Sequence, residues 1–339
     1  MGLFVDGYGH GLHLCINLGI CHVVIATCIV GKSFPAMLGS RFRQDIFMPA
    51  IHAAQIPSSL TSAFGLFRHP RRGLIDPTQM PRIERSLAAA RIDAAWLRTY
   101  CECVGLHSNE PALPALALQI AAAPLHLAIL ADARFPFRAL GLVHLSQQVA
   151  QTCAISPTAS IDLLAYTTDA QWEKRGMSFG LVTEARVDGE LCWQATTRAL
   201  ALGKSPTAST SAPRNADDDS TPPRFEQVID VPENCGRRYA KIAGDLNPIH
   251  QHALLAKPFG FKRAIVHGTW TLARALAVAG LPHSERFKFT ANFRRPVELP
   301  SRILVRAFGD IHSSQPSIVV QNAIDATMHL RVEFETSAV

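Results

Sequence analysis

The chain has 339 residues, of which 48% are apolar and 18% are charged. This composition supplies a sizeable core and excludes a disordered chain, a collagen-like chain and a disulfide-stapled miniprotein. At ~150 residues per domain, the length predicts two domains. The net charge of +6 suits an anionic small-molecule substrate and is too small to indicate a nucleic-acid partner.

The N-terminal region contains an apolar run at residues 12–31 that is about as long as a membrane span. His13, Asn17 and His22 interrupt the run, and no Lys or Arg precedes Lys32 as a secretory signal would require. A membrane anchor is the alternative. We favour an appended extension over residues 1–56 that is disordered or outside the fold, without membrane association.

The eight cysteines contain no Cys-x-x-Cys motif, which favours reduced thiols in a cytoplasmic protein. Zinc bound by Cys15, Cys21 and Cys28 together with His13 and His22 is conceivable, but no known ligand spacing fits. The prediction is therefore that the chain binds no metal.

A segment rich in Ser, Thr, Pro and Asp at residues 203–224 separates two halves. Such a composition cannot bury a core and predicts a flexible linker. The expected domains are residues 57–202 and 225–339.

The two halves have related patterns. Tyr100 precedes Gly105 at the same spacing at which Tyr239 precedes Gly244, and an apolar helix is predicted further along each half, at 112–131 and from 268. Alternating strands follow, at 140–149, 160–168, 177–187 and 190–201 in the first half and at 287–295, 302–310, 317–326 and 328–336 in the second. Each half is thus predicted to be α+β, with a helix first and then an antiparallel sheet that wraps it. The two sheets could join edge to edge.

The residues that indicate chemistry lie between Gly244 and Gly268. Asp245 and His250 place a carboxylate and an imidazole five residues apart, and Pro248 restricts Asn247 to an extended conformation. A carboxylate and a neutral imidazole around one water form an acid/base pair near neutral pH. His267 and Gly268 open an apolar helix, whose first N–H groups suit an oxygen that gains negative charge.

The string Tyr-x4-Gly-Asp-x-Asn-Pro-Ile-His from Tyr239 to His250 resembles the hydratase signature of the MaoC-like (R)-specific enoyl-CoA hydratases. The segments 259–268 and 289–301 also resemble that family. The resemblance is strong over 227–335, fainter over 80–200 and absent before about residue 57. It implies a double hotdog fold, with a degenerate first copy and a catalytic second copy.

The resemblance also implies the roles of the site residues. Asp245 and His250 would activate a water that adds across a trans-2-enoyl thioester, or run the dehydration of a (3R)-3-hydroxyacyl thioester in reverse. Asn247 would orient the pair, and the Gly268 amide would polarise the thioester carbonyl. Aligning the two glycines places Leu106 and Pro111 at the positions of Asp245 and His250, so the first copy would be inactive and accommodate the acyl chain.

His267 is a candidate substrate-binding residue. The basic pairs Lys262–Arg263 and Arg294–Arg295 could bind the phosphates of coenzyme A or of an acyl carrier protein. The sequence thus predicts a hydro-lyase of fatty-acid metabolism that needs no cofactor, acts on acyl-CoA or acyl-carrier-protein thioesters and could form a homodimer. The alternatives are a hotdog thioesterase and a non-catalytic acyl-CoA-binding protein.

Overall fold

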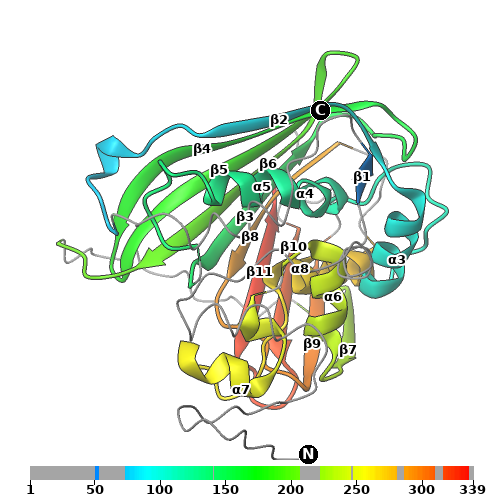
Figure 1. Ribbon diagram of the computed structural model, residues 1–339. Coiled ribbons are helices and arrows are strands. Elements are labelled where there is room, and N and C mark those ends of the chain that lie inside the picture. The colour runs from blue at the N-terminus through cyan, green and yellow to red at the C-terminus, as the bar shows by residue number, and fades with distance from the viewer. Residues whose placement is uncertain are drawn as a thin grey trace, which may run out of the picture. The chain divides into compact units, whose positions relative to one another are not determined.

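A computed structural model describes residues 50–52, 73–139, 141–206, 222–245, 247–280, 286–309 and 316–335. The strands in these ranges form one antiparallel sheet in the order β1-β2-β4-β5-β6-β3-β8-β11-β10-β9-β7 (Figure 1). The predicted strands are confirmed, and Asp188 and Gly189, which both have positive φ angles, form the hairpin turn between residues 187 and 190.

The strands before residue 203 occupy one side of the sheet. They are β1 (Ile51–His52), β2 (Glu84–Ile92), β3 (Val143–Gln151), β4 (Ile161–Glu173), β5 (Gly176–Val187) and β6 (Glu190–Leu202). The strands after residue 224 occupy the other side. They are β7 (Phe225–Val231), β8 (Phe287–Phe293), β9 (Ser301–Phe308), β10 (Ser317–Asn322) and β11 (Met328–Phe334).

The two sets have the same connectivity, since β2-β4-β5-β6-β3 corresponds strand for strand to β7-β9-β10-β11-β8. They meet where β3 pairs with β8, from Ser146 opposite Asn292 to Gln151 opposite Phe287. The expected joining of the two halves edge to edge is therefore confirmed. This pairing removes two strand edges that would otherwise expose backbone donors and acceptors.

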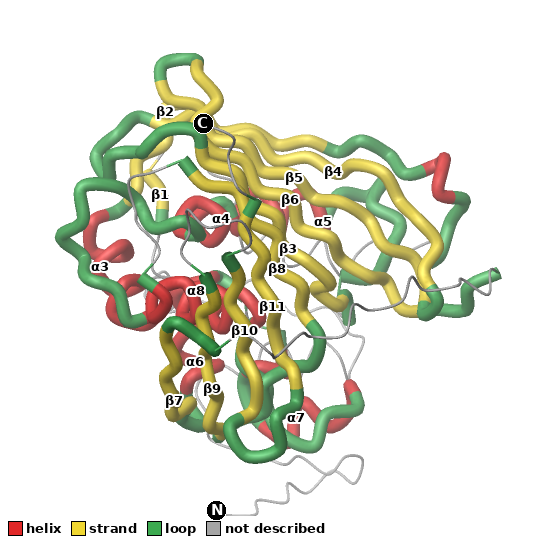
Figure 2. The backbone as a smooth tube through the Cα atoms, turned by 180° about the vertical axis from the view of Figure 1, so that it is seen from behind, coloured by secondary structure: helices red, strands yellow, loops and turns green. Residues whose placement is uncertain are grey.

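The helices are short and lie mainly on one face of the sheet (Figures 1 and 2). They are α3 (Ala94–Val104), α4 (Ala117–Ala121), α5 (Ala123–Leu130), α6 (Cys235–Ala243), α7 (Ala253–Ala256) and α8 (Gly268–Ala279), with 3-10 turns η2 (Pro77–Gln79), η3 (Pro248–His250) and η4 (Lys257–Phe259). Side chains from both halves contribute to one hydrophobic core. None of these helices has both the length and the hydropathy that a membrane span requires.

Two details differ from the sequence prediction. The apolar segment 112–131 is not one long helix but contains α4 and α5, because Pro124 lacks the N–H that a continuous helix would need at that position. A strand, β2 or β7, also precedes the helices of each half, whereas helices were expected first. The burial patterns of β2 and β7 do not alternate regularly, so they lack a clear strand signature.

The ends of the predicted domains are only partly described. Residues 48–339 form one compact unit, and Ile51, which was assigned to the extension, is buried in β1 against β2. The rest of the extension up to residue 49, with its apolar run and its cysteines, lies outside the described residues, as do residues 207–221 of the linker. The domain boundaries therefore remain a prediction.

The prediction of reduced thiols is wrong for one pair. Cys153, which follows β3, and Cys192 in β6 form a disulfide. Antiparallel pairing of β3 with β6 brings the two Cα atoms to 5.1 Å, within the usual range for a disulfide. The free thiols among the described residues are Cys101, Cys103 and Cys235.

The helices α3 and α6 end alike, at Gly105 and Gly244, which adopt left-handed φ angles of 76° and 69°. Arg274 of α8 reaches the end of α3, where its guanidinium donates to the carbonyl of Val104 at 3.2 Å. A Cβ at Gly105 would collide with this guanidinium.

We therefore predict that Gly105→Ala destabilises the protein more than Gly280→Ala. Gly280 ends α8 with a similar φ of 70°, but no described atom outside its immediate surroundings lies within 4 Å of a Cβ placed there. Gly280→Ala should cost about 1 kcal/mol for the left-handed backbone alone, and Gly105→Ala at least about 1 kcal/mol more. Urea unfolding measures both, and equal losses would contradict the role of Arg274.

Two half-buried histidines of the first half are uncharged near neutral pH. Burial lowers the pKa of His126, whose Nε2 lies 2.7 Å from Thr183 Oγ1, to about 4, and burial also lowers the pKa of His144 to about 4. Since the ordinary value is 6.5, the unfolded chain takes up these protons first as the pH falls.

The free energy of unfolding should therefore decrease as the pH falls from about 6.5 to about 4. His126→Gln removes one of these groups, so the slope of stability against pH in this window should become smaller by up to about 1.4 kcal/mol per pH unit. Urea midpoints measured between pH 4.5 and 7.5 test this, and an unchanged slope in the variant would refute it.

Candidate active site

The loop that follows α6 has the conformation that its Asn-Pro pair predicts. Asn247 is extended, with φ −50° and ψ 127°, and Pro248 begins the 3-10 turn η3. The N–H of Asn247 donates to Asp245 Oδ1 at 3.0 Å, and Asn247 Oδ1 accepts from the N–H of Ile249 at 3.4 Å. Asn247 thus connects the carboxylate to the turn that carries His250.

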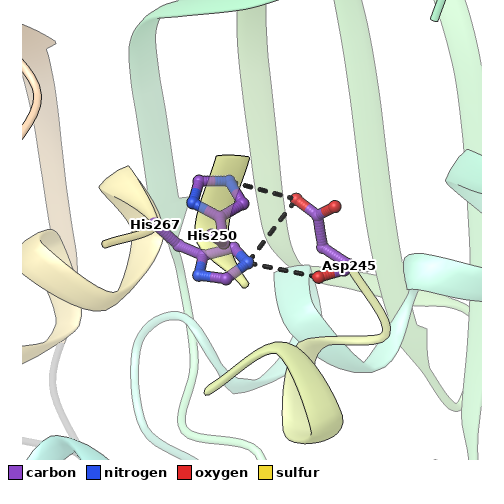
Figure 3. A group of neighbouring side chains, drawn as sticks. All are labelled: Asp245, His250 and His267. Atoms are coloured by element: carbon purple, nitrogen blue, oxygen red, sulfur yellow. Dashed lines mark hydrogen bonds and ion pairs between the residues drawn. The ribbon is translucent and has the colours of Figure 1, made fainter. Parts of the chain in front are cut away.

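Asp245, His250 and His267 form one cluster (Figure 3). The Nε2 atoms of His250 and His267 lie 3.9 and 3.7 Å from Asp245 Oδ2. The two imidazoles stack with centroids 3.6 Å apart, and both are buried, whereas the Asp245 side chain is 51% exposed. The carboxylate therefore lies on the solvent side of the imidazoles.

The orientation of His250 is set by the backbone. Its Nδ1 lies 2.8 Å from the carbonyl oxygen of Ile265. Because a carbonyl only accepts, Nδ1 carries the proton of the neutral ring, and Nε2 presents its lone pair towards Asp245.

His267 is held just before α8, and its Nε2 lies 3.3 Å from the backbone oxygen of Asp245. Burial and the neighbouring His250 lower the pKa of His267 to about 3, against the opposing attraction of Asp245. Desolvation raises the pKa of Asp245, but the two imidazoles and the N–H of Asn247 outweigh this effect and hold it below the ordinary value. At neutral pH, His267 is uncharged and Asp245 is a carboxylate.

The N-terminus of α8 adjoins this cluster. Gly268 is the first residue of the helix, and no side chain of the described residues caps its first N–H groups. These groups have no partners within the helix. A Cβ at Gly268 would lie 3.0 Å from the ring of Phe293, so a larger residue would need this ring to shift slightly. Trp270, two residues after Gly268, is buried.

The first half lacks this arrangement. Leu106 follows Gly105 where Asp245 follows Gly244, and His126 bonds to Thr183 instead of to a carboxylate. The Asp245 loop nevertheless adjoins the first half, because a Cβ at Gly244 would lie 3.7 Å from the Cβ of Ala123, where α5 begins.

The two basic pairs are exposed but lie apart. Residues 264–266 run antiparallel to residues 297–299, with Val266 bonded to Val297 and Leu299 bonded to Ala264. In this register, Arg294 and Arg295 lie just before Val297, near the point where the chain continues from Val266 to His267. Lys262 and Arg263 lie just before Ala264, at the opposite end of the paired segment. The neighbouring His252 caps α7 by accepting from the N–H of Leu254.

The cluster also has metal-binding chemistry. Asp245, His250 and His267 each offer one ligand atom, and these atoms lie within 4.8 Å of one another. Such a set could hold a divalent cation such as zinc, so the predicted absence of a metal remains untested.

Sequence reasoning missed two contributions to the site. The carbonyl of Ile265, which orients His250, is a backbone group and has no sequence signal. Trp96 of α3 donates its indole N–H to the carbonyl of Ile242 at the end of α6, and a contact across 146 residues leaves no local pattern.

Known proteins resemble this chain in sequence and fold. The family described as MaoC like domain matches residues 215–318. The 3-hydroxyacyl-thioester dehydratase X of Mycobacterium tuberculosis is 28% identical over 225 residues, which are 66% of this chain and 79% of that protein.

Two solved structures show the fold. The crystal structure of HtdX from Mycobacterium tuberculosis has a TM-score of 0.63 and 24% identity, and the match covers 74% of this chain and 98% of that one. A MaoC-like dehydratase from Phytophthora capsici has a TM-score of 0.62 and 15% identity, over 78% of this chain and 98% of that one. The expected hotdog fold is confirmed, and the match to the family described as MaoC like domain covers residues 215–318.

Proposed function

We propose that this chain is a hydro-lyase that interconverts trans-2-enoyl thioesters and (3R)-3-hydroxyacyl thioesters in fatty-acid metabolism. The observation that carries the proposal is the 3.9 Å separation of Asp245 Oδ2 from His250 Nε2, beside the uncapped N-terminus of α8. The similarity to a protein named 3-hydroxyacyl-thioester dehydratase X supports the same reaction class.

The separation suits one bound water. Two hydrogen bonds of ~2.8 Å from a single oxygen span 3.9 Å at an angle of about 90°. In the hydration direction, the water oxygen adds to C3 as its O–H bond breaks, and one proton reaches C2 through the Asp245–His250 pair. Because Asp245 and His250 form one cluster, the water would add from one side of the thioester and give a single configuration at C3, which we propose to be (3R).

The thioester oxygen gains negative charge as water adds. The N–H of Gly268 at the start of α8 would donate to it, because the first helical amides lack partners and carry the positive end of the helix dipole. Asn247 would maintain the orientation of the carboxylate through its N–H bond to Asp245 Oδ1.

The remaining features of the proposal concern the two halves. The repeated strand order supports a double hotdog, with residues 57–202 as the inactive copy that accommodates the acyl chain and 225–339 as the catalytic copy. His267, Lys262–Arg263 and Arg294–Arg295 would contact the substrate, with coenzyme A or acyl carrier protein as the carrier. The cytoplasmic location stays a prediction, and the Cys153–Cys192 disulfide counts against it because such bonds are rare in reducing compartments.

The first test removes the acid/base pair. Asp245→Asn and His250→Gln should each lower kcat for crotonyl-CoA or a long-chain trans-2-enoyl-CoA by about 10²- to 10⁴-fold, since each removes a proton-transfer group. Loss of the enoyl-thioester absorbance measures the rate, and the configuration of the product is assigned.

His252→Asn is the matched control, because residue 252 lies beside the pair and Asn retains the helix cap. Full activity in Asp245→Asn would contradict the proposal. Release of free thiol from a saturated acyl-CoA by the wild type would indicate a thioesterase instead.

The second test concerns pH. Because the pKa of His267 is lowered to about 3, this imidazole is already neutral above pH 5 and loses no proton between pH 5 and 8. We predict that His267→Gln, whose amide can still donate to the Asp245 carbonyl, leaves the shape of the kcat/KM profile unchanged in this window. If either limb of the kcat/KM profile moves by more than about half a pH unit in the variant, His267 takes up or releases a proton during turnover.

A further inference from the structure

The end of α6 is held by a side chain of the other half. Trp96, in the first turn of α3, is fully buried, and its Nε1 donates to the carbonyl oxygen of Ile242 at 3.0 Å. Ile242 lies among the last four residues of α6, whose carbonyls have no partner within the helix. The indole N–H therefore satisfies a buried acceptor at the helix end.

This helix end determines where Asp245 lies. Gly244 ends α6 with a φ of 69°, and Asp245 follows directly, three residues after Ile242. The Trp96 ring also stacks on Tyr100 with centroids 5.3 Å apart, so the indole cannot easily turn away. A displacement of the α6 end would change the distance between the carboxylate and the imidazole of His250, which belongs to the separate turn η3.

The contact is reciprocated. Trp270 of α8 donates its indole N–H to the carbonyl of Cys103 at 3.1 Å, and Arg274 donates to that of Val104 at 3.2 Å. The end of each Tyr-x4-Gly helix is thus held by a donor from the opposite half. The two contacts differ in consequence, because only α6 leads into a loop with an acid.

We propose that Trp96, a residue of the half without the acid and imidazole, is a positioning residue for Asp245. The inference rests on the proposed function of the Asp245–His250 pair. It assigns the first half a part in the reaction that is separate from accommodating the acyl chain. Because Trp96 acts on the acid and not on the substrate, its loss should lower kcat and leave KM nearly unchanged.

The test compares Trp96→Phe with Trp193→Phe. Trp193 is also buried, and its Nε1 donates to the carbonyl of Ala115 at 2.9 Å, within the first half. Both variants lose one indole N–H donor bond and the same side-chain volume, with a buried acceptor for Trp96 and a part-buried acceptor for Trp193. Steady-state hydration of a trans-2-enoyl-CoA and urea unfolding are measured for the wild type and for both variants.

We expect Trp96→Phe to lower kcat on the order of tenfold to a hundredfold with KM changed less than about twofold, since small misplacements of reacting groups have effects of this size. Trp193→Phe should be destabilised to a similar extent and retain kcat within about twofold. Equal kcat in the two variants, or a loss seen only as a higher KM, would overturn the inference. If Trp96→Phe does not fold, Trp96→Met, which also lacks the N–H donor, is measured by the same criteria.

The inference can fail separately from the proposed function. A wild type that hydrates enoyl thioesters while Trp96→Phe matches Trp193→Phe would refute only the role of Trp96. If the wild type hydrates no enoyl thioester, the proposed function fails. The role of Trp96 is then decided by the NMR resonances of the His250 and His267 rings, which must shift in Trp96→Phe and not in Trp193→Phe.

Discussion

The antiparallel pairing of β3 with β8 joins the two halves of the chain into one sheet, and the other contacts between the halves depend on it. Once these strands are paired, the helices of the two halves lie on the same face of a continuous sheet (Figures 1 and 2). Side chains of each half can then donate hydrogen bonds to the helix end of the other half, at α3 and at α6. These donors satisfy buried carbonyls, which would otherwise be costly to remove from water.

The electrostatics of the site follow from unequal burial of three side chains. His250 and His267 lie against each other in the interior, where a charge on either ring is costly, whereas Asp245 is about half exposed. The carboxylate keeps its charge because two imidazoles and a backbone N–H face it. The result is an ionised acid beside the neutral imidazole of His267 and within reach of the buried His250 ring, which is an arrangement suited to proton transfer.

The two halves show how one framework carries different chemistry. Each has a buried tyrosine, a helix that ends in a left-handed glycine and the same strand order. After that glycine, the first half continues with Leu106 and the second with Asp245. Both copies therefore keep the residues and strand order that form the fold, whereas the residues that would perform chemistry are present in one copy.

The sequence by itself determined the strands after each helix and the extended Asn247 before Pro248, because alternation and backbone sterics act over a few residues. It also indicated Asp245 and His250 through their spacing. The strands β2 and β7, the break at Pro124 and the Cys153–Cys192 disulfide were missed or wrongly predicted. Tertiary structure alone decided the stacking of His267 on His250, the Ile265 carbonyl that orients His250 and the Trp96 bond to α6. These contacts join backbone atoms and side chains distant in the chain, so they exist only after the two halves have packed.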